Sequence, residues 1–565
     1  MNLTQRIRSM NWKQLFAVIL IGWFLVNLLQ ALFTEIMNDE SYYALYGERL
    51  AWGYFDHPPM VALLTYFSAL LFDGNLSVRF VTLFFQIFTI MLMWKMLEEK
   101  TPDSRKVLLF FVINASMVMF VSYGFVVAPD VPLLFFATLF LYAYQRFLRR
   151  ESWTNMLLLT ISMAGMIYSK YHGLIIIGFV LLSNFKLLKS YKAWIAVVLT
   201  VVLLIPHIIW QVSMDFVTFK YHLVGRNFGF RWDEFLGHLP NQLAMFNPLT
   251  IGAVVYILVK YRPKDLFERA LFFQIIGFQA FFFLMTFKGY VQPHWTVPTT
   301  MAMIILIYRY SLKNEKLFRF VKKWVAPTII LVLVARVLLL TNLLPERLGF
   351  YGKEKKAKAI EQAAGDLPVV FTGSFQRSST YQYFSKNEAL LLSAVTSRQT
   401  QFDVWKKELE YQGKSVFISQ KVADRGAEYN INGERFSGFV TDNFQSVNRV
   451  RIEYKLPAKD VYPSDTLFIP FTISNPCGFD IDFNHSEFPV KLRIAFAKKR
   501  DIGIYDGTTN CTFDILKSKA EENAIFQVVV PELEQGKYQV ALTLDNGICP
   551  AKNSDFLSLR IKKKI

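Results

Sequence analysis

Charge is scarce in this sequence. Asp, Glu, Lys and Arg make up 19% of the 565 residues, whereas hydrophobic residues make up 53%. In residues 1–344 the apolar side chains form repeated runs of about twenty, which is the length that a helix needs to cross a bilayer. The sequence therefore predicts a polytopic helical membrane domain, and the total length predicts further domains after it.

Acidic residues are scarcer than basic ones, 44 against 62, so the net charge is +18. Such an excess of basic residues is compatible with nucleic-acid binding. Whether it indicates a nucleic-acid partner depends on where the Lys and Arg residues lie along the chain. Twenty-three Lys and Arg fall in segments on one side of the predicted spans, and six fall in the short segments on the other side. The positive-inside rule then places the N-terminus in the cytoplasm, and we expect no nucleic-acid partner.

Eleven apolar stretches are long enough to be candidate spans. They are residues 14–34, 78–97, 106–124, 131–147, 154–170, 173–187, 193–212, 247–259, 270–287, 296–308 and 325–344. An odd number of spans puts the residues after 344 outside. The first span lacks a small-residue cleavage site, so we expect no cleavable signal peptide.

Cysteine is rarer still. Cys477, Cys511 and Cys549 all lie in the part expected outside, where oxidation is possible. Three pairings are possible, and each leaves one thiol over. We assign these residues no functional role.

Carboxylates gather directly after the first span, where charge is costly to dehydrate. They are Glu35, Asp39, Glu40, Glu48 and Asp56. Short helices at about 38–50 and 58–72 are expected to flank the turn that holds Asp56 and His57, with the second helix at the membrane surface. Alternatively, residues 59–72 begin a long tilted span. We interpret residues 34–77 as the active-site loop of a membrane enzyme, and its Tyr and Trp side chains as chiefly an interfacial aromatic belt.

Other charged residues lie in loops that the topology sends to the same outer face. Asp130 stands in a turn between Pro129 and Pro132, where a lone Asp is often only a helix cap. The remaining candidates are Lys170 in YSKYHG, His222 and Arg226 in the long loop 215–246, and Lys288 and Trp295 in KGYVQPHW.

A carboxylate together with several cations at a membrane face suits sugar transfer from a lipid phosphate. The carboxylate takes the proton of the acceptor hydroxyl, and cations or a metal ion stabilise the leaving phosphate. A flippase or transporter of lipid-linked sugars is the alternative, but its charges are expected within spans, near broken helices. An inactive scaffold that recruits partners is a third possibility.

The composition changes after the last span. Residues 345–428 alternate helix and strand patterns and predict a small α/β subdomain. Residues 429–565 contain six alternating or buried strand patterns separated by Asn, Asp, Gly and Pro turns, which predicts a β-sandwich. The sandwich contains no clustered catalytic pattern, and we expect it to bind the acceptor or to pack on the outer mouth of the site.

Several motifs taken together resemble the polytopic GT-C glycosyltransferases, in particular bacterial aminoarabinose transferases and protein O-mannosyltransferases. The motifs are Asp39-Glu40 after the first span, YFDHPP at 54–59, the Pro-flanked Asp130 and KGYVQPHW at 288–295. The resemblance covers residues 1–345 in architecture, and the combination is more specific than any single motif.

The resemblance implies a role for each matched residue. Asp39 corresponds to the catalytic carboxylate and Asp130 to a second active-site acid. Residues expected to contact the donor phosphate are His57, Lys170, Arg226, Lys288 and Trp295. Asp56 and His222 correspond to positions that contact a metal, so we expect at most a loosely held divalent ion. His57 departs from the Lys of the aminoarabinose group, which puts its charge in doubt.

These observations predict a GT-C membrane protein with about eleven transmembrane helices and an extramembrane C-terminal region. We expect an inverting glycosyltransferase of the bacterial cytoplasmic membrane, with its active site and C-terminal domains in the periplasm. The expected partners are a polyprenyl-phosphate-linked sugar donor, a lipid glycan or protein acceptor, and membrane lipids.

Overall fold

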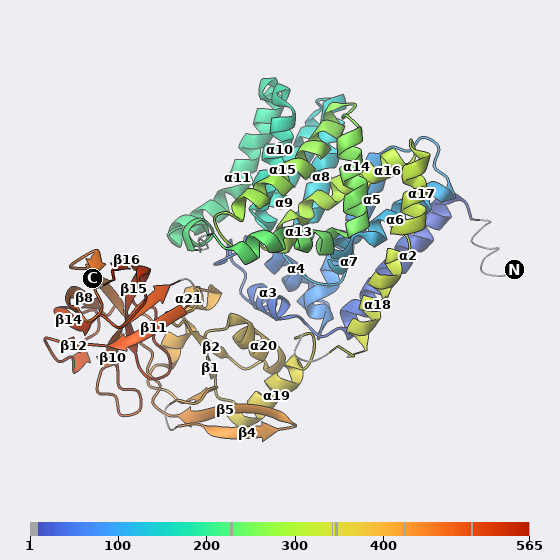
Figure 1. Cartoon of the computed structure of the whole chain (residues 1–565). Helices are drawn as coiled ribbons and strands as arrows, with labels where there is room; N and C mark the ends of the chain where they lie inside the picture. Colours follow the sequence, from blue (N-terminus) through green and yellow to red (C-terminus); the bar gives the residue numbers. More distant parts are fainter. Residues whose placement is uncertain are drawn as a thin grey trace. The chain divides into compact units, whose positions relative to one another are not determined.

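The computed structural model describes residues 10–225, 230–341, 343–344, 349–422, 425–498 and 501–563. The chain divides into two compact units, Met1–Tyr351 and Gly352–Ile565. The first unit is helical, and the second combines a mixed α/β part with a β-sandwich (Figure 1).

Six described helical segments of the first unit are long and apolar enough to cross a membrane. They are α2 (Trp12–Phe33), α5 (Leu76–Leu97), α8 (Asp130–Arg149), α11 (Tyr191–Ser213), α15 (Leu266–Met285) and the run Glu315–Leu340 that ends in α18 (Thr328–Leu340). A seventh arises if α13 (Trp232–Phe246) and α14 (Pro248–Lys260), bent by 100° at their junction, form one span. The chain is thus multi-pass, but the predicted count of about eleven is not confirmed.

The other predicted spans coincide with helices that are shorter than a full crossing. These are α6 (Ser104–Ser116), α7 (Val118–Ser122), α9 (Trp153–Ser169), α10 (His172–Ser183) and α16 (Thr300–Ser311). The predicted span 106–124 is interrupted by the extended backbone at Met117, between α6 and α7. Helix α16 is enclosed by its neighbours along nearly its whole length, so it belongs to the core of the unit.

A buried polar network joins helices far apart in sequence. Gln86 on α5 accepts hydrogen bonds from Trp23 Nε1 and Asn27 Nδ2 on α2, each at 2.7 Å. Arg336 on α18 donates to Asn27 Oδ1 at 2.5 Å. A Cβ added to Gly124 would lie 2.2 Å from Gln86 Oε1, so only glycine fits there. The network ties the first and last long helices to the same point.

The second unit begins with a five-stranded sheet in the order β2-β1-β3-β5-β4. Strand β1 runs parallel to its neighbours β2 and β3, whereas β4 and β5 form an antiparallel hairpin at the edge. The strands are β1 (Val369–Thr372), β2 (Ala389–Leu392), β3 (Val416–Ile418), β4 (Ala427–Ile431) and β5 (Glu434–Thr441), with helices α19 (Lys353–Ala364) and α20 (Phe375–Ser385). This part of the chain therefore combines helices with a mixed sheet, and the sheet extends to Thr441.

The rest of the second unit is rich in β-strands, which form two facing sheets. One sheet has the order β11-β10-β15-β16-β7 and the other β12-β14-β8-β6, and both face a common apolar core. The first sheet contains β7 (Asp460–Val461), β10 (Lys491–Lys498), β11 (Asp501–Asp506), β15 (Gly536–Asp545) and β16 (Leu557–Ile561); the second contains β6 (Arg451–Tyr454), β8 (Thr466–Ser474), β12 (Thr508–Thr509) and β14 (Glu521–Val529). Burial alternates along β8 and β14, as expected when one face of a sheet packs on a core. All three cysteines are free thiols.

Candidate active site

The loop after α2 carries two adjacent acids with opposite surroundings. Helix α3 (Asn38–Glu48) begins within this loop, and Asp39 and Glu40 lie in its first turn. Asp39 is exposed, whereas Glu40 is buried. The helix dipole stabilises a negative charge on either acid at the N-terminus of α3. Of the two acids, only Asp39 is exposed to solvent.

Glu40 forms a buried ion pair with Arg79 of α5. Arg79 Nε donates to Glu40 Oε1 at 2.8 Å, and its Nη2 contacts the other carboxylate oxygen. Glu40 also accepts from the backbone N–H of Met37 at 2.9 Å and of Val127 at 2.8 Å. Charge-assisted bonds of this kind are strong and directional. Glu40 thus caps α3 and also fixes the turn that leads to Asp130.

Arg79 also binds the backbone at the end of α2. Its Nη1 donates to the carbonyl oxygens of Ala31 at 3.1 Å and Thr34 at 2.6 Å, and its Nη2 donates to that of Glu35 at 3.2 Å. These carbonyls lie at and just after the end of α2, where helical acceptors lack intrahelical partners. One guanidinium therefore anchors the end of α2 to the start of α3.

The turn that contains Asp56 is held by buried tyrosines. Tyr46 donates its hydroxyl to Asp56 Oδ1 at 2.7 Å, and the rings of Tyr46 and Tyr54 stack at 4.0 Å. Tyr54 donates to the backbone carbonyl of Tyr46 at 2.9 Å. Tyr42, Tyr43 and Tyr54 are buried, so the expected aromatic belt is wrong for them, while Trp52 is 56% exposed. The tyrosines instead support the turn, because their hydroxyls find polar partners inside it.

Helices α3 and α4 (Met60–Ala69) flank this turn, as the sequence predicted. They pack closely enough that a Cβ added to Gly47 would lie 2.9 Å from the backbone nitrogen of Tyr66. The close approach leaves room only for glycine at position 47. It brings Tyr43 and Tyr46 of α3 over the Asp56 turn.

Asp56 and His222 are neighbours, but their contact is not that of two metal ligands. His222 lies in a π-helical turn, Tyr221–Gly225, and its Nε2 is 3.0 Å from the backbone oxygen of Asp56. Within the described ranges, no three His, Cys, Asp or Glu side chains gather as a metal site. Mg²⁺ and Ca²⁺ take six or more ligands, mostly oxygens, so this pair alone does not form a complete site for them.

Asp130 and Lys170 form a second buried ion pair. Lys170, which caps α9, donates to Asp130 Oδ1 at 2.8 Å and Oδ2 at 2.9 Å. The side chain of His294 approaches the same carboxylate, with Nε2 3.9 Å from Oδ2. Asp130 is 3% exposed and Lys170 6%. The two residues predicted as acid and phosphate contact therefore meet each other.

Trp295 belongs to a ring cluster beside this pair. It lies in η3 (Pro293–Thr299), 5.4 Å from the ring of His172 and 5.6 Å from that of Phe282. Its Nε1 donates to Gln292 Oε1 at 2.8 Å. Lys288, by contrast, is exposed after α15 and forms no ion pair within the described chain. Arg226 lies outside the described residues.

The charges of the site converge on Tyr43 and His57. Burial raises the pKa of Tyr43 well above its ordinary value, and the negative charges of Asp39, Asp56 and Asp130 raise it further. The charges of three acids from three segments of the chain thus act on one phenol. Tyr43 Oη lies 3.4 Å from His57 Nε2.

Burial also lowers the pKa of His57 to about 3, with Asp56 opposing this effect and the Lys170 cation adding to it. His57 is therefore neutral at neutral pH. In this state its ring is a hydrogen-bonding group rather than a cation.

Comparison with known proteins gives the same fold. Residues 56–210 match the family model described as dolichyl-phosphate-mannose-protein mannosyltransferase. The chain is similar to crystal structures of ArnT from Cupriavidus metallidurans. The apo structure gives 14% identity and a TM-score of 0.55 over 76% of this chain and 97% of that one. The structure bound to undecaprenyl phosphate gives 15% identity and a TM-score of 0.54 over 76% and 98%. No curated protein sequence matches the chain.

Proposed function

We propose that this chain, which has the ArnT fold and resembles polyprenyl-phosphate-sugar glycosyltransferases of the GT-C class, is itself such an enzyme. It takes a sugar from a polyprenyl-phosphate donor and transfers it, with inversion at the anomeric carbon, to a hydroxyl acceptor. The acceptor is a lipid glycan or a protein.

The exposed carboxylate of Asp39 carries this proposal. It stands in the first turn of α3 and, with Asp56 and Asp130, acts on the buried phenol of Tyr43. Its neighbour Glu40 is fully engaged by Arg79 and two backbone N–H groups. An accessible carboxylate on a rigid support is what a general base requires.

The proposed reaction is an inverting displacement in which Asp39 is the base. The acceptor hydroxyl gives its proton to Asp39 while its oxygen bonds to the anomeric carbon on the face opposite the phosphate. The bond between that carbon and the phosphate oxygen breaks, and the phosphate leaves with the electron pair. Negative charge then grows on the phosphate oxygens, where fixed donors lower the barrier.

Lys170 is the cation best placed to meet this charge. Asp130 holds its ammonium through two hydrogen bonds, so the amine is positioned before the donor arrives. His57, neutral at neutral pH, supplies a hydrogen bond. Trp295 provides an apolar wall beside them, and Lys288 and Arg226 remain predicted phosphate contacts. Asp130 acts as a positioning residue in this scheme.

The proposed setting is the bacterial cytoplasmic membrane. The excess of Lys and Arg in the segments opposite to the acidic loop supports a cytoplasmic N-terminus and a periplasmic active site. The C-terminal unit then lies in the periplasm. A divalent ion near Asp56 and His222 remains a prediction.

The test is the consumption of radiolabelled polyprenyl-phosphate sugars by purified protein, with crude membrane extract as acceptor. We compare the wild type with Asp39→Asn, and with Glu48→Gln as a matched control, because Glu48 is an exposed acid at the other end of the same helix. Wild type and Glu48→Gln are expected to consume a donor, and Asp39→Asn is not. Loss of activity with a chelator, restored by Mg²⁺ or Mn²⁺, would support the ion.

Two results would contradict the proposal. Equal consumption by wild type and Asp39→Asn would remove Asp39 from the reaction. No consumption by the wild type, combined with passage of a labelled lipid-linked sugar across protein-containing liposomes, would support the transporter alternative.

A further inference from the structure

The helices of the first unit have a second set of ends, far from the candidate active site. Asp130 lies in the first turn of α8, which is 20 residues long, so the last turn of this helix is about 30 Å away. There Arg149 pairs with Glu98, which follows α5. Arg309 of α16 donates to the carbonyl oxygen of Met96, near the end of α5, at 3.2 Å. The ends of α5, α8 and α16 therefore meet on the side of the unit opposite to Asp130.

Three lysines form a patch on this side, the lysine patch. Lys260 lies in the last turn of α14, Lys264 lies in the connection to α15, and Lys313 follows α16. All three side chains are exposed, and none forms an ion pair with a residue that the structure describes. The patch thus has three positive charges without a counter-ion in the described chain.

Tyrosine rings bring two of these lysines together. Lys260 Nζ donates to the hydroxyl of Tyr256 at 2.8 Å and lies 5.8 Å from the centre of the Tyr261 ring. Lys313 Nζ lies 5.6 Å from the centre of the Tyr310 ring, and the rings of Tyr261 and Tyr310 are 4.4 Å apart. The face of an aromatic ring attracts an ammonium group but does not neutralise its charge. The two lysines therefore lie on one pair of rings and keep their charges.

Asn314 joins the two chain connections that carry the patch. Its Nδ2 donates to the hydroxyl of Tyr261 at 2.7 Å and to that of Tyr256 at 3.1 Å, both near the end of α14. Its side-chain oxygen accepts from two backbone N–H groups in the first turn of α17 (Glu315–Phe320). One side chain therefore fixes the segment of Lys313 to the segment of Lys260, which holds the patch in place before a ligand binds.

Glu268 of α15 is the carboxylate beside the patch, and both of its oxygens are engaged. Oε2 accepts from the hydroxyl of Tyr310 at 3.2 Å and from the backbone N–H of Lys264 at 3.1 Å. Oε1 lies 3.4 Å from Arg309 Nη1. The side chain of Glu268 is buried. Glu268 therefore balances the charge of Arg309 and leaves the three lysines uncompensated.

Lys264 and Lys313 are close neighbours of the same charge. Burial of part of its side chain lowers the pKa of Lys313, and the Lys264 cation lowers it further. Like charges at short range repel each other, and an anion bound to both removes this repulsion. The lysine patch therefore favours an anionic ligand.

Exposed apolar side chains continue from the patch along α14. Val255 is 51% exposed and Val259 83%, and they lie four residues apart on one face of the helix. Helix α14 belongs to the bent pair that is long and apolar enough to cross a membrane. An anion site at the end of an apolar helix face matches a lipid, in which a charged headgroup is joined to acyl chains. A free inorganic anion would leave the apolar face uncovered.

We propose that the lysine patch binds the headgroup phosphate of an anionic phospholipid, with the acyl chains along Val255 and Val259. The lipid belongs to the leaflet opposite to the candidate active site, which is the cytoplasmic leaflet in the proposed topology. Lysines at a membrane surface attract anionic lipids, and the attraction adds up over the lysines that converge on one headgroup. This inference goes beyond the proposed sugar transfer and does not depend on it.

The test is native mass spectrometry of the full chain in detergent, titrated with phosphatidylglycerol and separately with phosphatidylcholine of the same acyl chains. The wild type is expected to bind phosphatidylglycerol more tightly. Lys313→Gln is expected to weaken this binding about fivefold, and replacement of all three lysines by Gln about a hundredfold. Lys313→Arg keeps the charge and is expected to bind like the wild type. Thermal unfolding in detergent checks that each variant folds.

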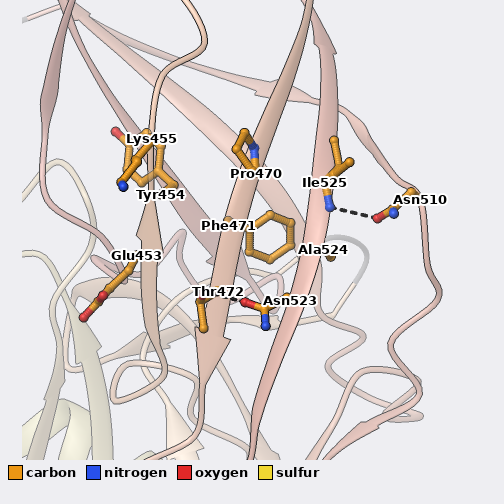
Figure 2. Close-up of a pocket in the computed structure, with 10 residues that line it drawn as sticks. All are labelled: Glu453, Tyr454, Lys455, Pro470, Phe471, Thr472, Asn510, Asn523, Ala524 and Ile525. Atoms are coloured by element: carbon orange, nitrogen blue, oxygen red, sulfur yellow. Dashed lines mark hydrogen bonds between the residues drawn. The ribbon is translucent and has the colours of Figure 1, made fainter.

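Lys455→Gln is the matched control. Lys455 is an exposed lysine of the second unit, and it lines a pocket on the sheet of β6, β8 and β14 together with Glu453 (Figure 2). Because an acid lies in the same pocket, removal of this lysine is expected to leave the binding of phosphatidylglycerol unchanged.

Four results would overturn the inference. The first is equal binding of the two lipids by the wild type, and the second is unchanged binding of phosphatidylglycerol after replacement of all three lysines. The third is an equal loss of binding in Lys455→Gln and Lys313→Gln, which would show a general effect of net charge. The fourth is displacement of phosphatidylglycerol by inorganic phosphate at equal concentration, which would identify a site for a free anion.

Discussion

The first turns of α3 and α8 each carry an acid that the sequence predicts to be catalytic, and the structure treats them differently. Asp39 at the start of α3 is exposed. Asp130 at the start of α8 is 3% exposed and receives two hydrogen bonds from Lys170. An acid that must accept a proton from an entering substrate needs access, whereas a buried, paired acid holds its partner. The difference separates the proposed base from a positioning residue.

The ion pair between Glu40 and Arg79 supports both of these turns. Glu40 accepts from Val127 N, only three residues before Asp130, and Arg79 binds the end of α2. The exposed acid and the buried pair are therefore set by one ion pair in the core. A buried charge that loses its partner is strongly destabilising, so this support is expected to matter more to folding than either acid alone.

The largest expected effect comes from Asp39→Asn. Loss of a general base lowers turnover by about 10²–10⁴-fold, while an exposed isosteric change alters the unfolding free energy by less than about 0.5 kcal/mol. Turnover and thermal unfolding, measured on the same preparation, check both. If Asp130→Asn reduced turnover as strongly and also left stability unchanged, the contrast between the two turns would be broken.

The second-largest expected effect is a loss of stability when the ion pair between Glu40 and Arg79 is broken. Arg79→Met leaves Glu40 buried without its counter-ion, and the expected loss of stability is about 3–5 kcal/mol. Removing both charges with Arg79→Met and Glu40→Gln is expected to recover part of this loss. Denaturation in detergent, followed by tryptophan fluorescence, measures it. Lys95→Met is a control in the same helix, since Lys95 lies in its last turn. If Arg79→Met were as stable as the wild type, Arg79 would not support the two turns.

Much of the site was predictable because its residues are anomalous in their sequence context. Asp39, Asp56 and Asp130 interrupt apolar or Pro-rich stretches, and the structure brings their charges to Tyr43. Arg79 was missed because it lies within LSVRFVTLFF and was counted inside a span. A lone arginine in a span is itself a signal, since an intramembrane charge requires a partner.

The span count and the tyrosines were harder to predict for a physical reason. Hydropathy measures how apolar a segment is, and an enclosed helix such as α16 is as apolar as one that faces lipid. A tyrosine near a membrane end is likewise typical of the interface, but Tyr46 and Tyr54 find partners in the folded loop. Both outcomes depend on tertiary neighbours, which the local pattern does not contain.

A smaller effect is expected from the second ion pair. Lys170→Met leaves Asp130 buried and unpaired, whereas Asp130→Asn with Lys170→Met removes both charges. The double variant is expected to be more stable than Lys170→Met alone, because the penalty of the isolated carboxylate disappears. A thermodynamic cycle over the two single variants and the double variant gives the coupling energy. Additive effects would show that the pair does not act as a unit.

The smallest effect concerns His57, on which the charges of Asp56 and Asp130 act. Its pKa is lowered from an ordinary value of 6.5 to about 3, chiefly by burial. Between these values the unfolded chain binds a proton that the folded chain does not, so stability falls as the pH falls below 6.5. His57→Gln removes this proton. Its melting temperature is therefore expected to fall less than that of the wild type between pH 7 and about pH 5.5, where most carboxylates remain charged. Parallel curves would mean that the ring of His57 takes up a proton in the folded protein as readily as in water, which would contradict its neutral form at neutral pH.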